Sequence, residues 1–168
     1  RPAGPRAAGE KLRILVVGGS QGAQGLNRAV LGAFGALSDE EKKRIAVTHI
    51  AGAHEHNPVS ERYRELGVNA RVHPFYKNMF ELFGAADLAI TRAGANTLFE
   101  LAFYGIPAFV IPFPYAGGHQ KLNAEAFAEK GALEFHEEND GARGWLEEKL
   151  KAVLSGTLKL ETMTRAMR

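Results

Sequence analysis

Short apolar runs rich in branched residues alternate with segments of helical spacing along the chain, and this alternation limits the folds it can adopt. Residues 13–17 (Arg-Ile-Leu-Val-Val) form the first run, which ends at a Gly-Gly pair. Residues 23–37 then place apolar side chains at helical intervals, at Leu26, Val30, Phe34 and Leu37. A continuous apolar strand that leads through a tight turn into a helix is typical of a buried parallel sheet.

The same pattern predicts about six strands, at residues 13–17, 45–50, 70–73, 87–91, 107–111 and 133–136. Helices are expected at residues 23–37, 59–66, 79–86, 96–104, 120–130, 142–154 and 159–168. Gly67, Gly105 and Gly131 stand where three of these helices should end. We therefore expect an α/β protein with a Rossmann-like, doubly wound parallel sheet.

The composition excludes several classes of protein. The formal net charge of +2 is too small for a nucleic-acid partner, which calls for a strong basic stripe. The absence of cysteine excludes disulfides and thiolate metal sites and agrees with a reducing compartment. Since no apolar run approaches the roughly 20 residues of a membrane span, the chain is expected to be soluble.

The first residues have a different composition from the rest. Residues 1–9 contain only Arg, Pro, Ala and Gly, and the chain does not begin with Met. We expect residues 1–11 to be a linker from a longer chain and residues 12–168 to be one domain. The alternative is the frayed end of a complete protein.

Four loops follow strands and should meet at one edge of the sheet, because ligands of such folds bind outside the carboxyl ends of the strands. These loops are residues 18–22, 74–78, 92–96 and 112–119. In the first loop, the glycines allow close backbone approach and the following helix start favours a phosphate. Its candidate ligand-binding residues are Gly19, Ser20, Gln21 and Gly22. The alternative is an ordinary strand-to-helix turn with Ser20 as the N-cap.

A second helix start follows the fourth predicted strand. Asn96 or Thr97 can cap this helix, and Glu100 lies one turn further on the same face. A carboxylate there can accept two hydrogen bonds from a ribose diol. The alternative is a surface glutamate that the helix dipole stabilises.

The loop after the fifth predicted strand leads into His119, Gln120 and Asn123. Side-chain amides suit sugar hydroxyls because they both donate and accept hydrogen bonds. Helix capping is the alternative role. His119 has no carboxylate in its segment to orient it as a base, and His54 with His56 lacks a third metal ligand, so no metal site is expected.

These three motifs, in this order, resemble those of the bacterial UDP-N-acetylglucosamine:lipid I N-acetylglucosaminyltransferases, the MurG family. The resemblance runs from residue 12 to about residue 156. It implies one half of a GT-B fold, the C-terminal domain that binds UDP-GlcNAc. A separate N-terminal domain would bind undecaprenyl-linked lipid I, contact the cytoplasmic face of the inner membrane and supply the catalytic base, so no catalytic residue is expected in this chain.

The resemblance also implies roles for single residues. Ser20 would contact the diphosphate, Tyr76 would meet uracil through its backbone, and Glu100 would hold the ribose hydroxyls. Arg92 would shape the pocket beside Gly94, and Ala95 and Asn96 would supply helix amides. Gln120, with His119 and Asn123, would contact the GlcNAc hydroxyls. No cofactor is implied, because UDP-GlcNAc is the substrate.

Two departures from the family pattern stand out. The stretch Tyr76-Lys77-Asn78 stands where the family usually has an aliphatic residue followed by acids. The family's Asn-Pro-Val-Arg stretch would lie before Arg1. Two alternatives stay open: a donor-binding subunit of a split glycosyltransferase, inactive alone, and a sugar-phosphate epimerase of related fold.

Overall fold

A single parallel sheet forms the centre of the protein. The computed structural model describes residues 9–19, 24–115 and 117–168. Six strands pair in the order β3-β2-β1-β4-β5-β6. Every pairing is parallel. The strands are β1 (Leu12–Val17), β2 (Ile45–Ile50), β3 (Ala70–His73), β4 (Leu88–Thr91), β5 (Ala108–Val110) and β6 (Leu133–Phe135). This order and pairing confirm the predicted Rossmann-like, doubly wound sheet.

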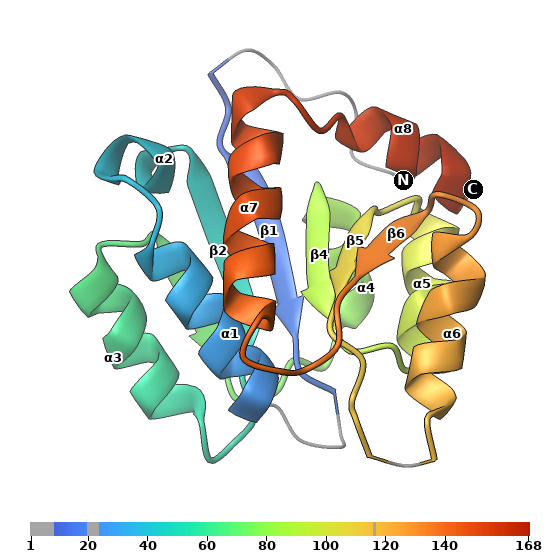
Figure 1. Ribbon diagram of the computed structural model, residues 1–168. Coiled ribbons are helices and arrows are strands. Elements are labelled where there is room, and N and C mark those ends of the chain that lie inside the picture. Colours follow the sequence, from blue (N-terminus) through green and yellow to red (C-terminus); the bar gives the residue numbers. More distant parts are fainter. Residues whose placement is uncertain (1–8, 20–23, 116) are drawn as a thin grey trace.

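Helices cover both faces of the sheet (Figure 1). In the view of Figure 1, α1 (Gln24–Gly35), α3 (His56–Leu66) and α7 (Ala142–Ser155) lie in front of the sheet. The opposite face carries α4 (Met79–Ala85), α5 (Ala95–Tyr104) and α6 (His119–Ala128). The short α2 (Asp39–Lys43) and the final α8 (Leu160–Met167) lie at the edge where the strands begin.

Each face of the sheet has its own apolar core, because side chains alternate along a strand. Within β1, Ile14 packs with the cluster under α1, α3 and α7, whereas Leu15 packs with the cluster under α4, α5 and α6. Both side chains are about 1% exposed. Burial on both faces explains why β1 reads as a continuous apolar run rather than as an alternating one.

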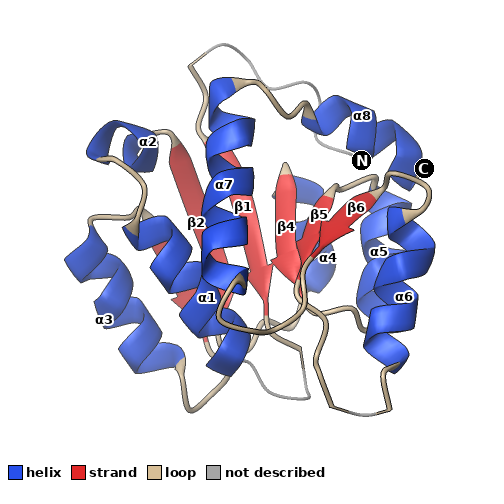
Figure 2. Cartoon of the chain, viewed as in Figure 1, coloured by secondary structure: helices blue, strands red, loops and turns tan. Residues whose placement is uncertain are grey.

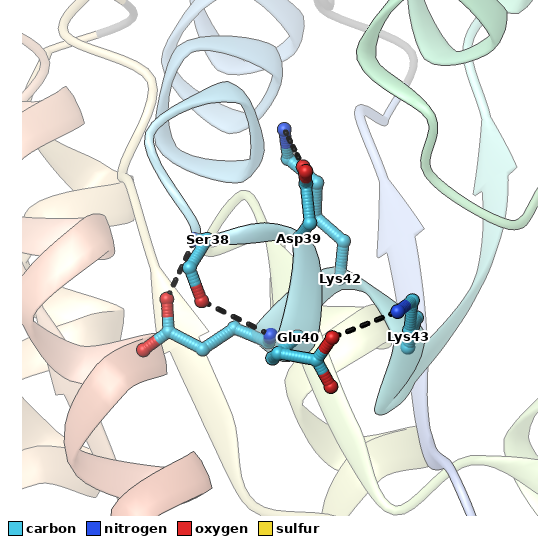
Figure 3. Close-up of polar contacts among 6 residues, drawn as sticks. Ser38, Asp39, Glu40, Lys42 and Lys43 are labelled. Carbon is cyan, nitrogen blue, oxygen red and sulfur yellow. Dashed lines mark hydrogen bonds and ion pairs between the residues drawn. The ribbon is translucent and has the colours of Figure 1, made fainter.

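The sequence pattern missed α2, which has five residues and no buried side chain. Its formation is explained by a capping box (Figure 3). The Ser38 hydroxyl accepts a hydrogen bond from the Glu41 backbone, and the Glu41 carboxylate accepts one from the Ser38 backbone. Lys43 and Glu40 add an ion pair of 2.7 Å on the exposed side.

Helix α3 begins at His56, three residues before its predicted start at Val59. Pro58 is compatible with this position because the first turn of a helix needs no backbone donor there. The helix ends at Gly67, whose φ of 68° is left-handed, as predicted for a glycine C-cap.

The strand order determines where the sheet can bind a ligand. β1 and β4 are neighbours, with Val17 opposite Thr91, although 70 residues separate the two strands in the chain. The chain leaves β1 toward one face of the sheet and leaves β4 toward the other, as the helices and strands of Figure 2 show. Between two such diverging connections the sheet has a crevice where ligands of this fold bind.

Candidate functional site

A pocket of about 400 Å³ opens at the carboxyl ends of β1 and β4. The turn after β1 contributes Gly18 and Gly19, and Gln120 comes from the start of α6. The remaining lining comes from the end of β4 and the start of α5: Thr91, Arg92, Gly94, Ala95, Asn96 and Thr97. The pocket therefore lies at the crevice that the strand order creates.

The start of α5 provides hydrogen-bond donors to this pocket. Gly94 is the N-cap with extended backbone (φ −64°, ψ 134°), and no side chain caps the helix. The first backbone bond of the helix runs from the Leu98 N–H to the Gly94 carbonyl at 3.1 Å. The N–H groups of Ala95, Asn96 and Thr97 therefore have no partner within the helix. Three free donors and the positive end of the helix dipole favour an anion.

Arg92 is a buried charged residue in the pocket lining, at 3% exposure. Its guanidinium pairs with the Glu138 carboxylate at 2.7 Å and donates to the Ile111 carbonyl at 3.2 Å. The Phe113 ring lies 5.5 Å from the guanidinium carbon. Its Nε has no partner among the described residues. Arg92 thus connects the loops after β4, β5 and β6.

Glu138 also lies against the start of α1. A Cβ placed on Gly25, the second residue of α1, would lie 1.6 Å from Glu138 Oε1. The carboxylate therefore occupies space that only glycine leaves open, next to the positive end of that helix. The Glu138 carboxylate already lies beside the start of α1. Among the described residues, the start of α5 is therefore the helix terminus that presents free donors to the pocket.

The structure describes eleven of the predicted site residues and brings seven of them together in the pocket lining. Those that line the pocket are Gly19, Arg92, Gly94, Ala95, Asn96, Thr97 and Gln120. Those described outside its lining are Tyr76, Glu100, His119 and Asn123. Ser20, Gln21 and Gly22 fall outside the described residues. Their predicted contacts with a donor stay predictions.

Two further predicted residues lie outside the pocket lining. Glu100 is exposed on α5, one helical turn beyond Asn96, as its spacing predicted. Tyr76 lies in the loop after β3, where its ring contacts His73 edge-on with centroids 5.1 Å apart. Its hydroxyl donates to Glu81 at 3.4 Å, so the side chain is directed to the protein. A contact with a ligand through the Tyr76 backbone remains compatible with this arrangement.

The predictions missed Glu138 and Thr91. The Thr91 hydroxyl donates to the Val17 carbonyl at 3.0 Å and so links the ends of the two central strands. Glu138 follows β6, whose carboxyl end meets the same edge of the sheet as that of β4. The sequence signal that could have identified Glu138 is its position shortly after a predicted parallel strand, because such residues lie at the ligand-binding edge of the sheet.

A second ion pair connects the loop after β6 with α6. Lys121 donates to the Glu137 carboxylate, and both side chains are substantially exposed. The hydrogen bond and charge of Lys121 lower the pKa of Glu137, and the same bond raises the pKa of Lys121. Because water screens this exposed pair, it is expected to contribute little to holding α6, unlike the buried pair of Arg92 with Glu138.

Comparison with known proteins identifies the family. The sequence profile described as "Glycosyltransferase family 28 C-terminal domain" matches residues 13–168, nearly the whole chain. The chain belongs to this family. The glycine turn, the start of α5 and the start of α6 are thus parts of a family 28 C-terminal domain.

The family 28 relatives are longer than this chain. The UDP-N-acetylglucosamine–N-acetylmuramyl-(pentapeptide) pyrophosphoryl-undecaprenol N-acetylglucosamine transferase of Pseudomonas fluorescens is 40% identical over 162 residues, which are 96% of this chain and 45% of that protein. The protein of the same name from Methylococcus capsulatus is 41% identical over 156 residues, 92% of this chain and 43% of that one. The chain spans less than half the length of these relatives.

A solved structure agrees with the fold. The crystal structure of Acinetobacter baumannii MurG superposes with a TM-score of 0.83 at 29% identity, covering 96% of this chain and 46% of that one. This likeness confirms that the chain has the fold of one half of a GT-B protein. Within the part of the chain that the structure describes, no helix is long and apolar enough to cross a membrane.

Proposed function

We propose that this chain is the donor-binding half of an inverting glycosyltransferase that transfers GlcNAc from UDP-GlcNAc to lipid I, forming lipid II. The observation that carries the proposal is the pocket at the ends of β1 and β4, where three free N–H groups of α5 face the same space as Arg92 and Gln120. The family membership and the names of the relatives support the choice of donor and acceptor.

The diphosphate of the donor fits best at the start of α5. The amides of Ala95, Asn96 and Thr97 supply donors for its oxygens, and Gly19 lines the same pocket from the turn after β1. We expect Ser20, Gln21 and Gly22, which lie outside the described residues, to contact the donor as well. Glu100, one turn further along α5, is placed to accept hydrogen bonds from the ribose diol. The uracil then lies toward Tyr76, and the sugar lies toward His119, Gln120 and Asn123.

In the proposed reaction, this half of the enzyme stabilises the leaving group. An acceptor hydroxyl attacks the anomeric carbon, the bond from that carbon to the diphosphate oxygen breaks, and UDP leaves with the electron pair. The hydroxyl proton passes to a base outside this chain. Amide donors already oriented at the diphosphate stabilise its growing charge without reorganisation, and we infer that they do so without a metal ion.

In this proposal, the rest of the enzyme binds the acceptor and contacts the membrane. Lipid I, with its undecaprenyl chain, would bind a second domain at the cytoplasmic face of the membrane, and this half would contact the membrane only through that domain. A donor-binding subunit of a split transferase is the second candidate, because the pocket of this chain serves either arrangement. Both arrangements predict donor binding without turnover by this chain alone.

A ligand panel tests the proposal. Thermal unfolding of the chain is followed with UDP-GlcNAc, UDP-glucose, GDP-mannose and NAD, with and without EDTA. A ligand that binds only the folded state raises the melting temperature with its concentration. We expect the largest shift with UDP-GlcNAc, unchanged by EDTA. A shift from NAD alone, or from none of the four, would reject donor binding at this pocket.

A further inference from the structure

Both backbone polar groups of Ala93, in the turn between β4 and α5, are hydrogen-bonded to side chains of α6. Its N–H donates to Gln120 Oε1 at 3.0 Å, and its carbonyl accepts from Asn123 Nδ2 at 3.0 Å. Ala93 is fully buried, so each of these polar atoms needs a partner. Residues three apart on a helix share one face, which is how Gln120 and Asn123 both reach the backbone of Ala93.

Gln120 holds a second loop as well. Its Oε1 also accepts from the Phe113 N–H at 2.9 Å, so the loop after β5 is joined to the turn after β4 through one oxygen atom. Two N–H donors fix which end of the amide is the oxygen, and they use both of its lone pairs. The Nε2 group is the part of Gln120 left for the pocket that this residue lines. Gln120 therefore offers a ligand donors and no acceptor.

The turn that these amides hold determines where α5 begins. Gly94 follows Ala93 directly and is the N-cap, and no side-chain hydrogen bond caps the helix. The first residues of α5, Ala95 and Asn96, are exposed. The first turn thus gains little support from packing, and the position of its free N–H groups depends on the turn before it.

We propose that Gln120 and Asn123 are positioning residues that clamp the backbone of Ala93 and so hold the start of α5 in the geometry that binds a diphosphate. The inference rests on the proposed function for the identity of the ligand. It assigns Asn123 a role that acts through Ala93. It also limits Gln120 to recognising hydrogen-bond acceptors, such as phosphate oxygens or the lone pairs of sugar hydroxyls.

Three variants separate this role from general stability. Asn123→Ala deletes one bond of the clamp at a residue outside the pocket lining. Gln120→Glu keeps an oxygen for the two backbone donors but replaces the donor that faces the pocket with a charged oxygen. Ser38→Ala is the matched control, since it removes the α2 cap at the opposite edge of the sheet and lowers stability there.

The readouts are the affinities for UDP by calorimetry and for uridine by NMR titration, with the melting temperature of each variant. For Asn123→Ala we expect UDP affinity to fall about fivefold, the factor of one ordinary hydrogen bond, with uridine affinity unchanged. For Gln120→Glu we expect a near-normal melting temperature and a UDP affinity at least tenfold lower. Ser38→Ala should lower the melting temperature and leave the ratio of the two affinities unchanged.

Failure of the proposed function and failure of the clamp would give different results. If the original chain does not bind UDP, the proposed function fails; the clamp is then judged by hydrogen exchange of the Ala93 amide, which Asn123→Ala should accelerate and Ser38→Ala should not. If the original chain binds UDP but Asn123→Ala leaves the ratio of UDP to uridine affinity unchanged, the clamp has no positioning role. A Gln120→Glu protein that binds UDP normally would overturn the donor-only assignment.

Discussion

The guanidinium of Arg92 and the carboxylate of Glu138 meet at 2.7 Å, although 46 positions separate them in the chain. Their side chains are 4% and 21% exposed, so water screens the pair only in part. The pair balances the charge of Arg92 in the ligand-free protein. Much of the positive character that the pocket offers an anion then comes from the backbone donors of α5.

Replacing Glu138 with Gln should destabilise the free protein yet increase the stabilising effect of UDP. The neutral side chain leaves the Arg92 charge uncompensated, which costs roughly 1–3 kcal/mol, and an anionic ligand then supplies the missing charge. Melting temperatures with and without UDP measure both effects. Glu137→Gln, at the neighbouring exposed pair, is the control and should change neither. An equal UDP shift in Glu138→Gln and the original protein would contradict the prediction.

Gly25→Ala should weaken the same ion pair from the other side. The new methyl group would lie 1.6 Å from Glu138 Oε1, so the carboxylate has to move. We expect a net loss of stability, although alanine favours a helix over glycine by about 1 kcal/mol. Denaturant unfolding gives the free-energy change.

Two further variants isolate the cause of that loss. Gly144→Ala in α7 is the matched control, because nothing lies within 4 Å of its added Cβ, and it should be neutral or stabilising. In a Glu138→Ala background the clash is gone, so Gly25→Ala should there become stabilising. A loss of the same size in both backgrounds would show that the carboxylate is not its cause.

Glu100→Ala should reduce UDP affinity roughly tenfold or more, because each hydrogen bond to a charged group contributes about 1.5–3 kcal/mol. The loss should be specific to the ribose, so calorimetry with UDP and 2′-deoxy-UDP is the measurement. The variant should bind the two ligands about equally, whereas the original protein should prefer UDP. Glu129→Ala, at the exposed C-cap residue of α6, is the control. Unchanged UDP affinity in Glu100→Ala would remove Glu100 from the ribose role.

Folding stability should decrease below about pH 6.5 because of His49. Its ring is fully buried between the Tyr63 hydroxyl at 2.8 Å and Asn27 Oδ1 at 2.7 Å. Since Asn27 Oδ1 only accepts, Nε2 carries the proton and Tyr63 donates to Nδ1. Burial lowers the pKa of His49 to about 3. Between these pH values the unfolded chain binds a proton that the native ring does not, which costs about 1.4 kcal/mol per pH unit.

Urea unfolding at several pH values measures this slope. His49→Gln should be less stable at neutral pH, and its stability should change less between pH 6.5 and pH 4. His54→Gln, at an exposed histidine in the loop before α3, should keep the original slope. If the two variants lose stability with the same pH dependence, the buried ring is not the titrating group.

Much of the fold could be predicted from the sequence because its signals are local. The branched run of β1, the helical spacing of α1 and the glycine that ends α5 each depend on a few neighbouring residues. The loop before α5 could be identified as functional for the same reason, since it follows a buried strand. Helix α2 was not predicted, because a capping box, rather than an apolar face, explains its formation.

The amino-acid sequence by itself determined the α/β alternation, the doubly wound sheet and the loops that form the pocket. Only the tertiary structure decided the strand order that brings β1 beside β4, the pairing of Arg92 with Glu138, and the hydrogen bonds between α6 and the backbone of Ala93. The periodicity of apolar residues predicts which face of a helix or strand is buried, but it does not predict which distant segment packs against that face. Those contacts arise when the chain buries both faces of one sheet, because each buried polar group must then find a partner in whatever segment packs against it.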